Sequence, residues 1–343
     1  MTTTLTIALD WTPNTNHTPF YVAQHLNLLP STLQLRFVTP LDDQYSVSPA
    51  KKVLTSQADI ALGPSESVLA HQDDKRDQVI AVAALLGKDA SAIVTLDPQV
   101  KSPKDLRGKR YASYRAKYEE GLVREMIKRD VGDQASESDT HFDVDEDEQR
   151  LGIWQKMVDD AKTPTSNESQ TKIDFTWIFL PWEGLQPYPP PANIKAFTFA
   201  ESGISYGYSP LLIVGRSWLQ KDDNQTALRQ LLAALAKAVQ WTIEHPKEAA
   251  EVLRTANPDL VELQDAEFLE ASQRRVNGYY LEGDGGDERS WGRMRTERWE
   301  GFVDVLRAIG RDNGEGKEWT ELDGDVGRLY TNEFLSEARD AAV

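Results

Sequence analysis

The chain has no cysteine among its 343 residues. This absence excludes disulfides, thiolate zinc sites, iron–sulfur clusters and thiol nucleophiles. Positive charge is also scarce, since 38 basic residues face 55 acidic ones and the formal net charge is −17. Such an acidic protein disfavours nonspecific binding to nucleic acid or anionic lipid. No apolar run approaches the roughly 20 residues that a membrane-spanning helix needs.

The first residues, MTTTLTIALDW, lack the basic segment, apolar core and small-residue cleavage site of a secretory signal. We therefore expect a cytoplasmic protein whose first strand begins near Thr4. The hydrophobic content of 40% and the nine tryptophans suit a globular chain with substantial cores. We expect a small-molecule ligand, with no nucleic-acid partner and no membrane insertion. The oligomeric state stays open.

Apolar patterning predicts a β-α-β-α-β order in the first part of the chain, with strands expected at 4–9, 33–38, 58–62, 79–86 and 92–96 and helices at 20–29, 50–56 and 65–70. This order implies a parallel sheet with right-handed crossovers. The α/β pattern restarts after Leu96, a strand near 208–215 returns towards the first half, and helices follow from residue 224. We predict two α/β lobes, formed by residues 1–96 with 200–343 and by residues 97–199.

Ligands of open α/β sheets bind beyond the carboxyl ends of the strands. The loops after Leu9, Leu62, Tyr114 and Leu180 are therefore the candidate binding loops. A ligand cleft between the two lobes is the expected site.

The first candidate loop is DWTPNTNHT, which begins with Asp10 and Trp11. An indole can stack on a flat ring, and a carboxylate accepts hydrogen bonds from an exocyclic amine or a ring N–H. In the alternative interpretation the indole packs under its own loop and Asp10 caps the next turn. Asn14 and His17 are candidate ligand contacts that could equally be turn and cap residues for the following helix.

The segment LPWEG places Trp182 and Glu183 at the end of a second apolar strand. Two Trp–acid pairs, one in each predicted lobe, suit the clamping of one aromatic ring that carries an amine. The alternative is that Glu183 caps a short helix before Gly184. Further candidates are Ser65 and Glu66 at a helix start, Tyr114 after a strand, and Tyr206 and Tyr208 near the return crossing.

Catalytic and metal motifs are poorly represented. The five histidines are isolated, and the sequence contains no HExxH, EF-hand, Walker, GxGxxG or GxSxG motif. The GDGGD segment at 283–287 fits neither a metal nor a phosphate loop in its spacing, and it is interpreted as a surface turn. We expect no metal, no cofactor and no catalytic residue.

Four segments, LDWTPNTNHTPFYVAQ, QADIALGPSES, SPKDLRGKRYASY and FTWIFLPWEGL, resemble the superfamily of thiamine-pyrimidine binding proteins and fungal thiamine-pyrimidine (hydroxymethylpyrimidine phosphate) synthases. The resemblance implies the two-lobed, type II periplasmic-binding-protein fold of transporter substrate-binding proteins, with mixed, mostly parallel sheets flanked by helices. It also implies that Trp11 stacks on a pyrimidine while Asp10 and Glu183 bind its ring nitrogens and amino group.

The synthases of this superfamily use a histidine as a source of pyrimidine atoms, a lysine that binds pyridoxal phosphate, and a cysteine-rich segment linked to iron. Here Gly63-Pro64-Ser65-Glu66-Ser67 stands where that lysine and histidine are expected, and cysteine is absent. The expected glycine-rich phosphate loop is replaced by residues 114–118, YRAKY. The sequence therefore favours a binding protein for an aminopyrimidine thiamine precursor. The alternatives are a synthase-type enzyme and a related protein for another ligand, such as a sulfonate.

Overall fold

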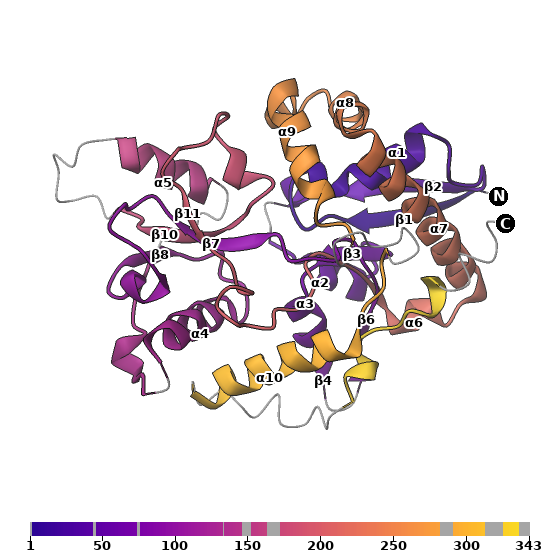
Figure 1. The fold of residues 1–343 in the computed structure, drawn as a ribbon. Helices are drawn as coiled ribbons and strands as arrows, with labels where there is room; N and C mark the ends of the chain where they lie inside the picture. The colour runs from indigo at the N-terminus through magenta and orange to yellow at the C-terminus, as the bar shows by residue number, and fades with distance from the viewer. Residues whose placement is uncertain are drawn as a thin grey trace. The chain divides into compact units, whose positions relative to one another are not determined.

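The computed structural model describes residues 2–43, 46–73, 76–132, 134–145, 152–162, 172–281, 291–312 and 325–335. Contacts divide the chain into two units (Figure 1). Unit 1 comprises Met1–Asp89, Gly207–Glu300 and Leu322–Val343, and unit 2 comprises Ala90–Tyr206 and Gly301–Glu321. Residues 301–312, which the sequence assigns to the first lobe, group by contact with unit 2.

Unit 1 contains a five-stranded sheet in the order β2-β1-β3-β12-β6. Its strands are β1 (Thr3–Ala8), β2 (Leu33–Val38), β3 (Ile60–Gly63), β6 (Val79–Ala84) and β12 (Leu211–Gly215). β1 runs parallel to β2 and β3, whereas β12 runs antiparallel to its neighbours β3 and β6. The parallel pairing expected from the strand order is found among β1, β2 and β3, and the returning strand β12, which enters between β3 and β6, makes the sheet mixed, as the family resemblance implies.

Helices accompany this sheet, namely α1 (Thr18–His25), α2 (Pro49–Leu54), α3 (Ser65–Leu69), α6 (Arg216–Leu219), α7 (Asp222–Glu244), α8 (Pro246–Ala256) and α9 (Ala266–Asn277). α1 contacts α7 and α8, and α2 contacts β1, β3 and β12. The short strands β4 (Gln72–Asp73) and β5 (Arg76–Asp77), which the sequence does not reveal, pair with each other. Single-turn 3₁₀ helices are η1 (Thr15–His17), η2 (Pro40–Asp42), η6 (Val261–Leu263) and η8 (Val326–Arg328).

Unit 2 contains a second five-stranded sheet in the order β11-β7-β10-β8-β9. Its strands are β7 (Ser91–Thr95), β8 (Arg110–Ala112), β9 (Asp143–Val144), β10 (Phe175–Phe179) and β11 (Lys195–Phe197). β7 runs antiparallel to β10 and β11, and β8 runs parallel to β9 and β10. The acidic segment at 134–148 has few apolar residues, which predicts a partial loop, and the structure places the two-residue edge strand β9 within it.

The helices of the second sheet's region are α4 (Glu119–Val131) and α5 (Ile153–Lys162), with the 3₁₀ turns η3 (Pro103–Leu106), η4 (Glu137–Asp139) and η5 (Glu183–Leu185). α10 spans Thr296–Asp312. Together, the two mixed sheets and their helices confirm the predicted α/β class.

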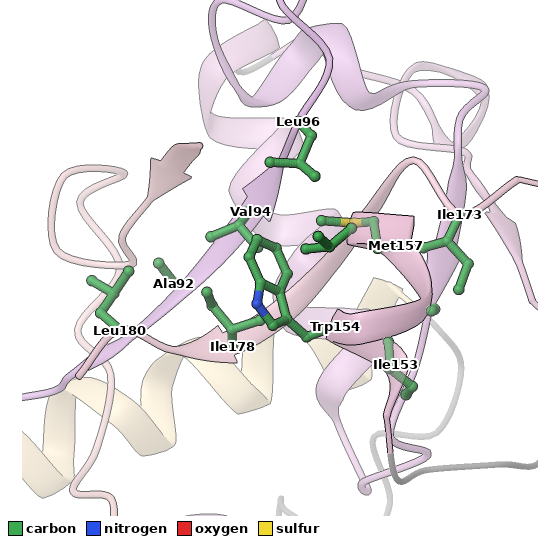
Figure 2. Packing of buried hydrophobic residues seen from close by; sticks show 11 residues of the cluster. Ala92, Val94, Leu96, Ile153, Trp154, Met157, Ile173, Ile178 and Leu180 are labelled. Atoms are coloured by element: carbon green, nitrogen blue, oxygen red, sulfur yellow. The ribbon is translucent and has the colours of Figure 1, made fainter. Parts of the chain in front are cut away.

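A hydrophobic cluster joins α5 to the second sheet (Figure 2). Trp154 and Met157 of α5 lie against strand residues Val94 and Ile178. The Trp154 indole N–H also donates a hydrogen bond of 2.6 Å to the carbonyl oxygen of Gln186. This bond anchors the loop that follows β10 and η5.

Some segments predicted from the sequence lie wholly or partly outside the described residues. The GDGGD turn lies outside the described residues, and so does the polar segment TPTSNESQ at 163–170, whose composition predicts a loop. The sequence also predicts a final helix near 330–341, which is described only to residue 335, with residues 333–335 helical. Within the described residues, no helix combines the length and apolar character needed to cross a membrane.

Candidate functional site

One edge of the first sheet carries three of the predicted groups. β1 and β3 are parallel, with Ala8 paired to Ala61, so their carboxyl ends meet at this edge. β12 is antiparallel to β3, and its first residue, Leu211, pairs with Gly63. The edge therefore receives the Asp10–His17 loop, the start of α3, and the residues just before β12.

Asp10 and His17 are in direct contact at this edge. The Nε2 atom of His17 lies 2.9 Å from Oδ1 of Asp10. The imidazole is fully buried, while 24% of the Asp10 side chain and part of Trp11 are exposed. Asp10, Trp11 and Thr12 are thus the accessible residues of this loop, and His17, which contacts Asp10, is buried.

The turn between Asp10 and His17 is closed by its own side chains. Asn14 Oδ1 accepts a hydrogen bond of 2.9 Å from the backbone N–H of Asn16, and Asn14 Nδ2 donates to the carbonyl of Thr12. The backbone N–H of Asn14 in turn donates to His17 Nδ1 at 3.1 Å. These bonds form a capping box for η1, so Asn14 is the cap that the alternative interpretation of the sequence describes.

Helix α9 and the residues after it form hydrogen bonds with the same turn. The hydroxyls of Thr15 and Ser272 lie 2.7 Å apart, and the Thr18 hydroxyl donates to Gln273 Oε1 at 2.6 Å. The Tyr280 hydroxyl donates to the carbonyl of Thr15 at 3.0 Å. All three partners lie about 260 residues later in the chain, so the turn is fixed by long-range contacts.

Ser65 is buried at the start of α3, and its hydroxyl serves the backbone of Tyr208. The hydroxyl donates to the Tyr208 carbonyl at 3.1 Å and accepts from the Tyr208 N–H at 2.7 Å. The N-cap of α3 is Pro64, and Ser65 is the first residue of the helix. Its hydroxyl is bonded to the backbone of Tyr208, just before β12. Glu66 follows in the first turn of α3 and is also buried.

Tyr208 is fully buried in unit 1. Its hydroxyl accepts a hydrogen bond of 2.8 Å from the backbone N–H of Arg295, and the Arg298 guanidinium lies 4.0 Å from its ring centroid. Arg298 also donates to the carbonyl oxygens of Gly87 and Gly207. Tyr208 is therefore surrounded by the chain itself in this structure.

In unit 2, Trp182 and Glu183 follow the end of β10 as expected. Trp182 is buried and Glu183 is partly exposed. Glu183 Oε2 accepts a hydrogen bond of 3.0 Å from the backbone N–H of Phe179, and η5 begins at Glu183. The carboxylate thus folds back on the end of the strand while keeping some exposure. It does not cap η5, whose N-cap is Trp182, without a side-chain capping hydrogen bond.

Tyr206 lies within an aromatic cluster of unit 2. It stacks on Phe199 at a centroid distance of 5.0 Å and meets Phe302 and Trp177 edge-on. Its ring is buried by these three neighbours. Tyr114 is partly exposed at the start of the turn that joins β8 to α4.

A buried carboxylate that the sequence did not single out closes the turn after β8. Glu119, the first residue of α4, is 3% exposed. Its carboxylate accepts hydrogen bonds from the Tyr111 hydroxyl and from the backbone N–H groups of Tyr114 and Ala116. Burial raises the pKa of Glu119, while these three bonds act in the opposite direction. One sequence feature could have identified Glu119: it stands three residues after Ala116, at the start of a helix. An acid in the first turn of a helix often accepts hydrogen bonds from free N–H groups.

The predicted site residues therefore differ in solvent exposure. The partly exposed ones are Asp10, Trp11, Tyr114 and Glu183, and the buried ones are Asn14, His17, Ser65, Glu66, Trp182, Tyr206 and Tyr208. The accessible set consists of two carboxylates and two aromatic rings. In chemical terms these groups can accept hydrogen bonds and stack on a flat ring.

Comparisons with known proteins agree with this geometry at the level of the fold. A protein of Bordetella bronchiseptica RB50 has a similar structure, with a TM-score of 0.66 and 16% identity over 98% of this chain and 97% of that one. The periplasmic aliphatic sulphonate binding protein SsuA of Escherichia coli is similar at a TM-score of 0.59 and 11% identity, over 92% and 91%. The periplasmic nitrate-binding protein NrtA of Synechocystis PCC 6803 is similar at 0.59 and 12% identity, over 99% and 89%.

The structural matches confirm the predicted periplasmic-binding-protein fold. They contradict the cytoplasmic location expected from the first residues, because the similar proteins named above include periplasmic ones. A comparison with curated proteins finds no match. The sequence itself matches the family described as NMT1/THI5 like over residues 14–249, which is more than half of the chain. The chain thus belongs to the NMT1/THI5-like family.

Proposed function

We propose that this protein binds a small heteroaromatic ligand, with an aminopyrimidine thiamine precursor as the first ligand to test. The observation that carries the proposal is the Asp10 carboxylate, which is partly exposed next to Trp11 and held by buried His17. Such a pair offers a stacking face together with an acceptor for an amino group or a ring N–H. In unit 2, Glu183 is a second partly exposed carboxylate, whereas the neighbouring Trp182 is buried.

The fold supports a role as the substrate-binding component of an importer, and we infer an extracytoplasmic location. The similarity to periplasmic sulphonate- and nitrate-binding proteins supports both inferences. Protease treatment of intact and of permeabilised cells of the source organism tests the location. Degradation only after permeabilisation of the inner membrane would contradict it.

Isothermal titration with hydroxymethyl- and formylaminomethyl-aminopyrimidines tests the ligand. We expect saturable heat from the wild-type protein, and a loss of roughly tenfold or more in affinity for Asp10→Asn, since a hydrogen bond to a charged group contributes about 1.5–3 kcal/mol. Asp223→Asn, at an exposed acid in the first turn of α7, is the matched control and should bind as the wild type does. Folded wild-type protein that gives no heat with either compound would rule out this ligand class.

An anion such as a sulfonate is the second candidate, and the similarity to the sulphonate-binding protein favours it. The accessible carboxylate of Asp10 argues against it, because an anion bound beside Asp10 would be repelled by its like charge. Asp10→Ala separates the two candidates: it weakens binding of an aminopyrimidine, whereas binding of a sulfonate stays intact. Mass spectrometry of any small molecule that copurifies with the protein provides an unbiased check.

A further inference from the structure

Both ring nitrogens of His17 already have partners in unit 1. Nδ1 lies 3.1 Å from the backbone nitrogen of Asn14, and Nε2 lies 2.9 Å from Asp10 Oδ1. A backbone N–H can only donate, so Nδ1 must present its lone pair and carries no proton. The imidazole is therefore neutral, with its proton on Nε2 and directed at Asp10.

The surroundings hold this ring in place. His17 is fully buried, and its backbone N–H donates to the carbonyl of Asn14 at 2.9 Å. The neighbouring Thr15 is fixed by Ser272 and Tyr280. With both nitrogens engaged and no surface exposed, His17 has no lone pair to offer a metal or a ligand.

We propose that His17 is a positioning residue that orients the Asp10 carboxylate for the ligand. A neutral donor fixes one carboxylate oxygen and leaves the negative charge on Asp10, whereas an imidazolium would neutralise it. An ionised carboxylate can accept further hydrogen bonds beside the one from His17. The arrangement therefore selects a ligand edge that carries N–H donors, a specificity that rests on the function proposed above.

The tautomer can be measured without any ligand. Long-range ¹H–¹⁵N correlation spectra, with His17 assigned from a His17→Gln sample, should show a neutral ring protonated at Nε2 at about neutral pH. In Asp10→Asn the Nε2 proton resonance should shift, because its acceptor changes from a charged oxygen to a neutral amide. An imidazolium, a ring protonated at Nδ1, or a resonance unaffected by Asp10→Asn would overturn the proposal.

Two substitutions separate positioning from packing. His17→Asn keeps an acceptor near Nδ1 for the Asn14 N–H but has no group that reaches Asp10. His17→Gln places its amide nitrogen near the former Nε2 and retains a donor for Asp10. Both remove the ring, and each loses one of its two hydrogen bonds: His17→Asn loses the bond to Asp10, and His17→Gln loses the acceptor of the Asn14 N–H. Both variants should therefore be less stable than the wild type.

Titration with hydroxymethyl-aminopyrimidine should then show a loss of about tenfold for His17→Asn, as expected for one lost hydrogen bond to a charged group. His17→Gln should recover most of that loss. Equal losses in the two folded variants, or wild-type affinity in His17→Asn, would contradict the positioning role. No heat from the wild type would contradict the proposed function, while the spectra still decide whether His17 holds Asp10.

Discussion

The hydroxyl of Tyr111 donates a hydrogen bond of 2.6 Å to Oε1 of Glu119 at the point where β8 leads into α4. Both side chains are buried, and the same carboxylate accepts the N–H groups of Tyr114 and Ala116. Burial raises the pKa of Glu119 above its ordinary value of 4.5. The folded protein therefore binds this proton more tightly than the unfolded chain does.

This difference predicts how the contribution of Glu119 to stability changes with pH. The stabilisation that Glu119 contributes is fully present below the unfolded-state pKa of about 4.3. It is lost as the pH rises through the higher pKa of the folded state. We expect the difference in unfolding free energy, wild type minus Glu119→Gln, to fall as the pH rises through that window. Urea unfolding at a series of pH values measures it. A difference that grows with pH would mean that the three donors outweigh burial.

Ser65→Ala should lower stability without changing ligand affinity. The substitution leaves the buried N–H of Tyr208 without its acceptor, at a cost of about 1–3 kcal/mol. Denaturant unfolding and a ligand titration on the same sample measure the two effects. Ser67→Ala on the same helix is the control and should be nearly neutral. A Ser65→Ala protein of normal stability but weaker binding would show instead that this hydroxyl contacts the ligand.

Gly292→Ala should destabilise unit 1. Gly292 has a φ of +81°, and an added Cβ would lie 2.9 Å from Leu335 Cδ2 and 3.4 Å from the Ala83 Cβ. The strained backbone alone costs about 1–3 kcal/mol. Gly278→Ala, at a negative φ with only ordinary contacts, is the matched control. Equal melting temperatures for the two variants would contradict this account of Gly292.

Met157→Ala should lower the stability of unit 2 by about 2–5 kcal/mol, since it leaves a cavity among Trp154, Val94 and Ile178. Gln155→Ala, on the exposed side of α5, should change stability little. Thermal unfolding followed by near-UV circular dichroism reports the loss. A Met157→Ala protein as stable as Gln155→Ala would mean that the cluster repacks without a cavity.

Local patterns predicted most of the elements because their physical causes are local. The alternation of Leu33, Leu35 and Phe37 predicts a strand at 33–38, which is the extent of β2. Periodic apolar residues likewise predict helices at 119–129 and 226–244, which agree with α4 and α7 to within a few residues. The strand β9 escaped prediction because two residues at a sheet edge have too little apolar surface to form a pattern.

The candidate site was predictable only in part. Asp10 and Trp11 stand out because a strand ends in an acid and an indole, and the structure leaves both partly exposed. The hydrogen bonds between the Ser65 hydroxyl and the Tyr208 backbone could not be predicted, since the two residues are 143 positions apart. Glu119 was missed for a related reason, because its donors come from a turn whose backbone shape the sequence does not display.

The central place of β12 in the first sheet constrains how the chain can fold as it is made. β3 and β6 precede Ala90, but among the described strands β12 is the one that pairs with both, and it follows the main segment of unit 2. During synthesis on the ribosome, β3 and β6 keep the edges that face β12 unpaired until Leu211–Gly215 has emerged. Exposed strand edges attract other chains. Translation speed and chaperone access through the intervening segment therefore become determinants of yield for this protein.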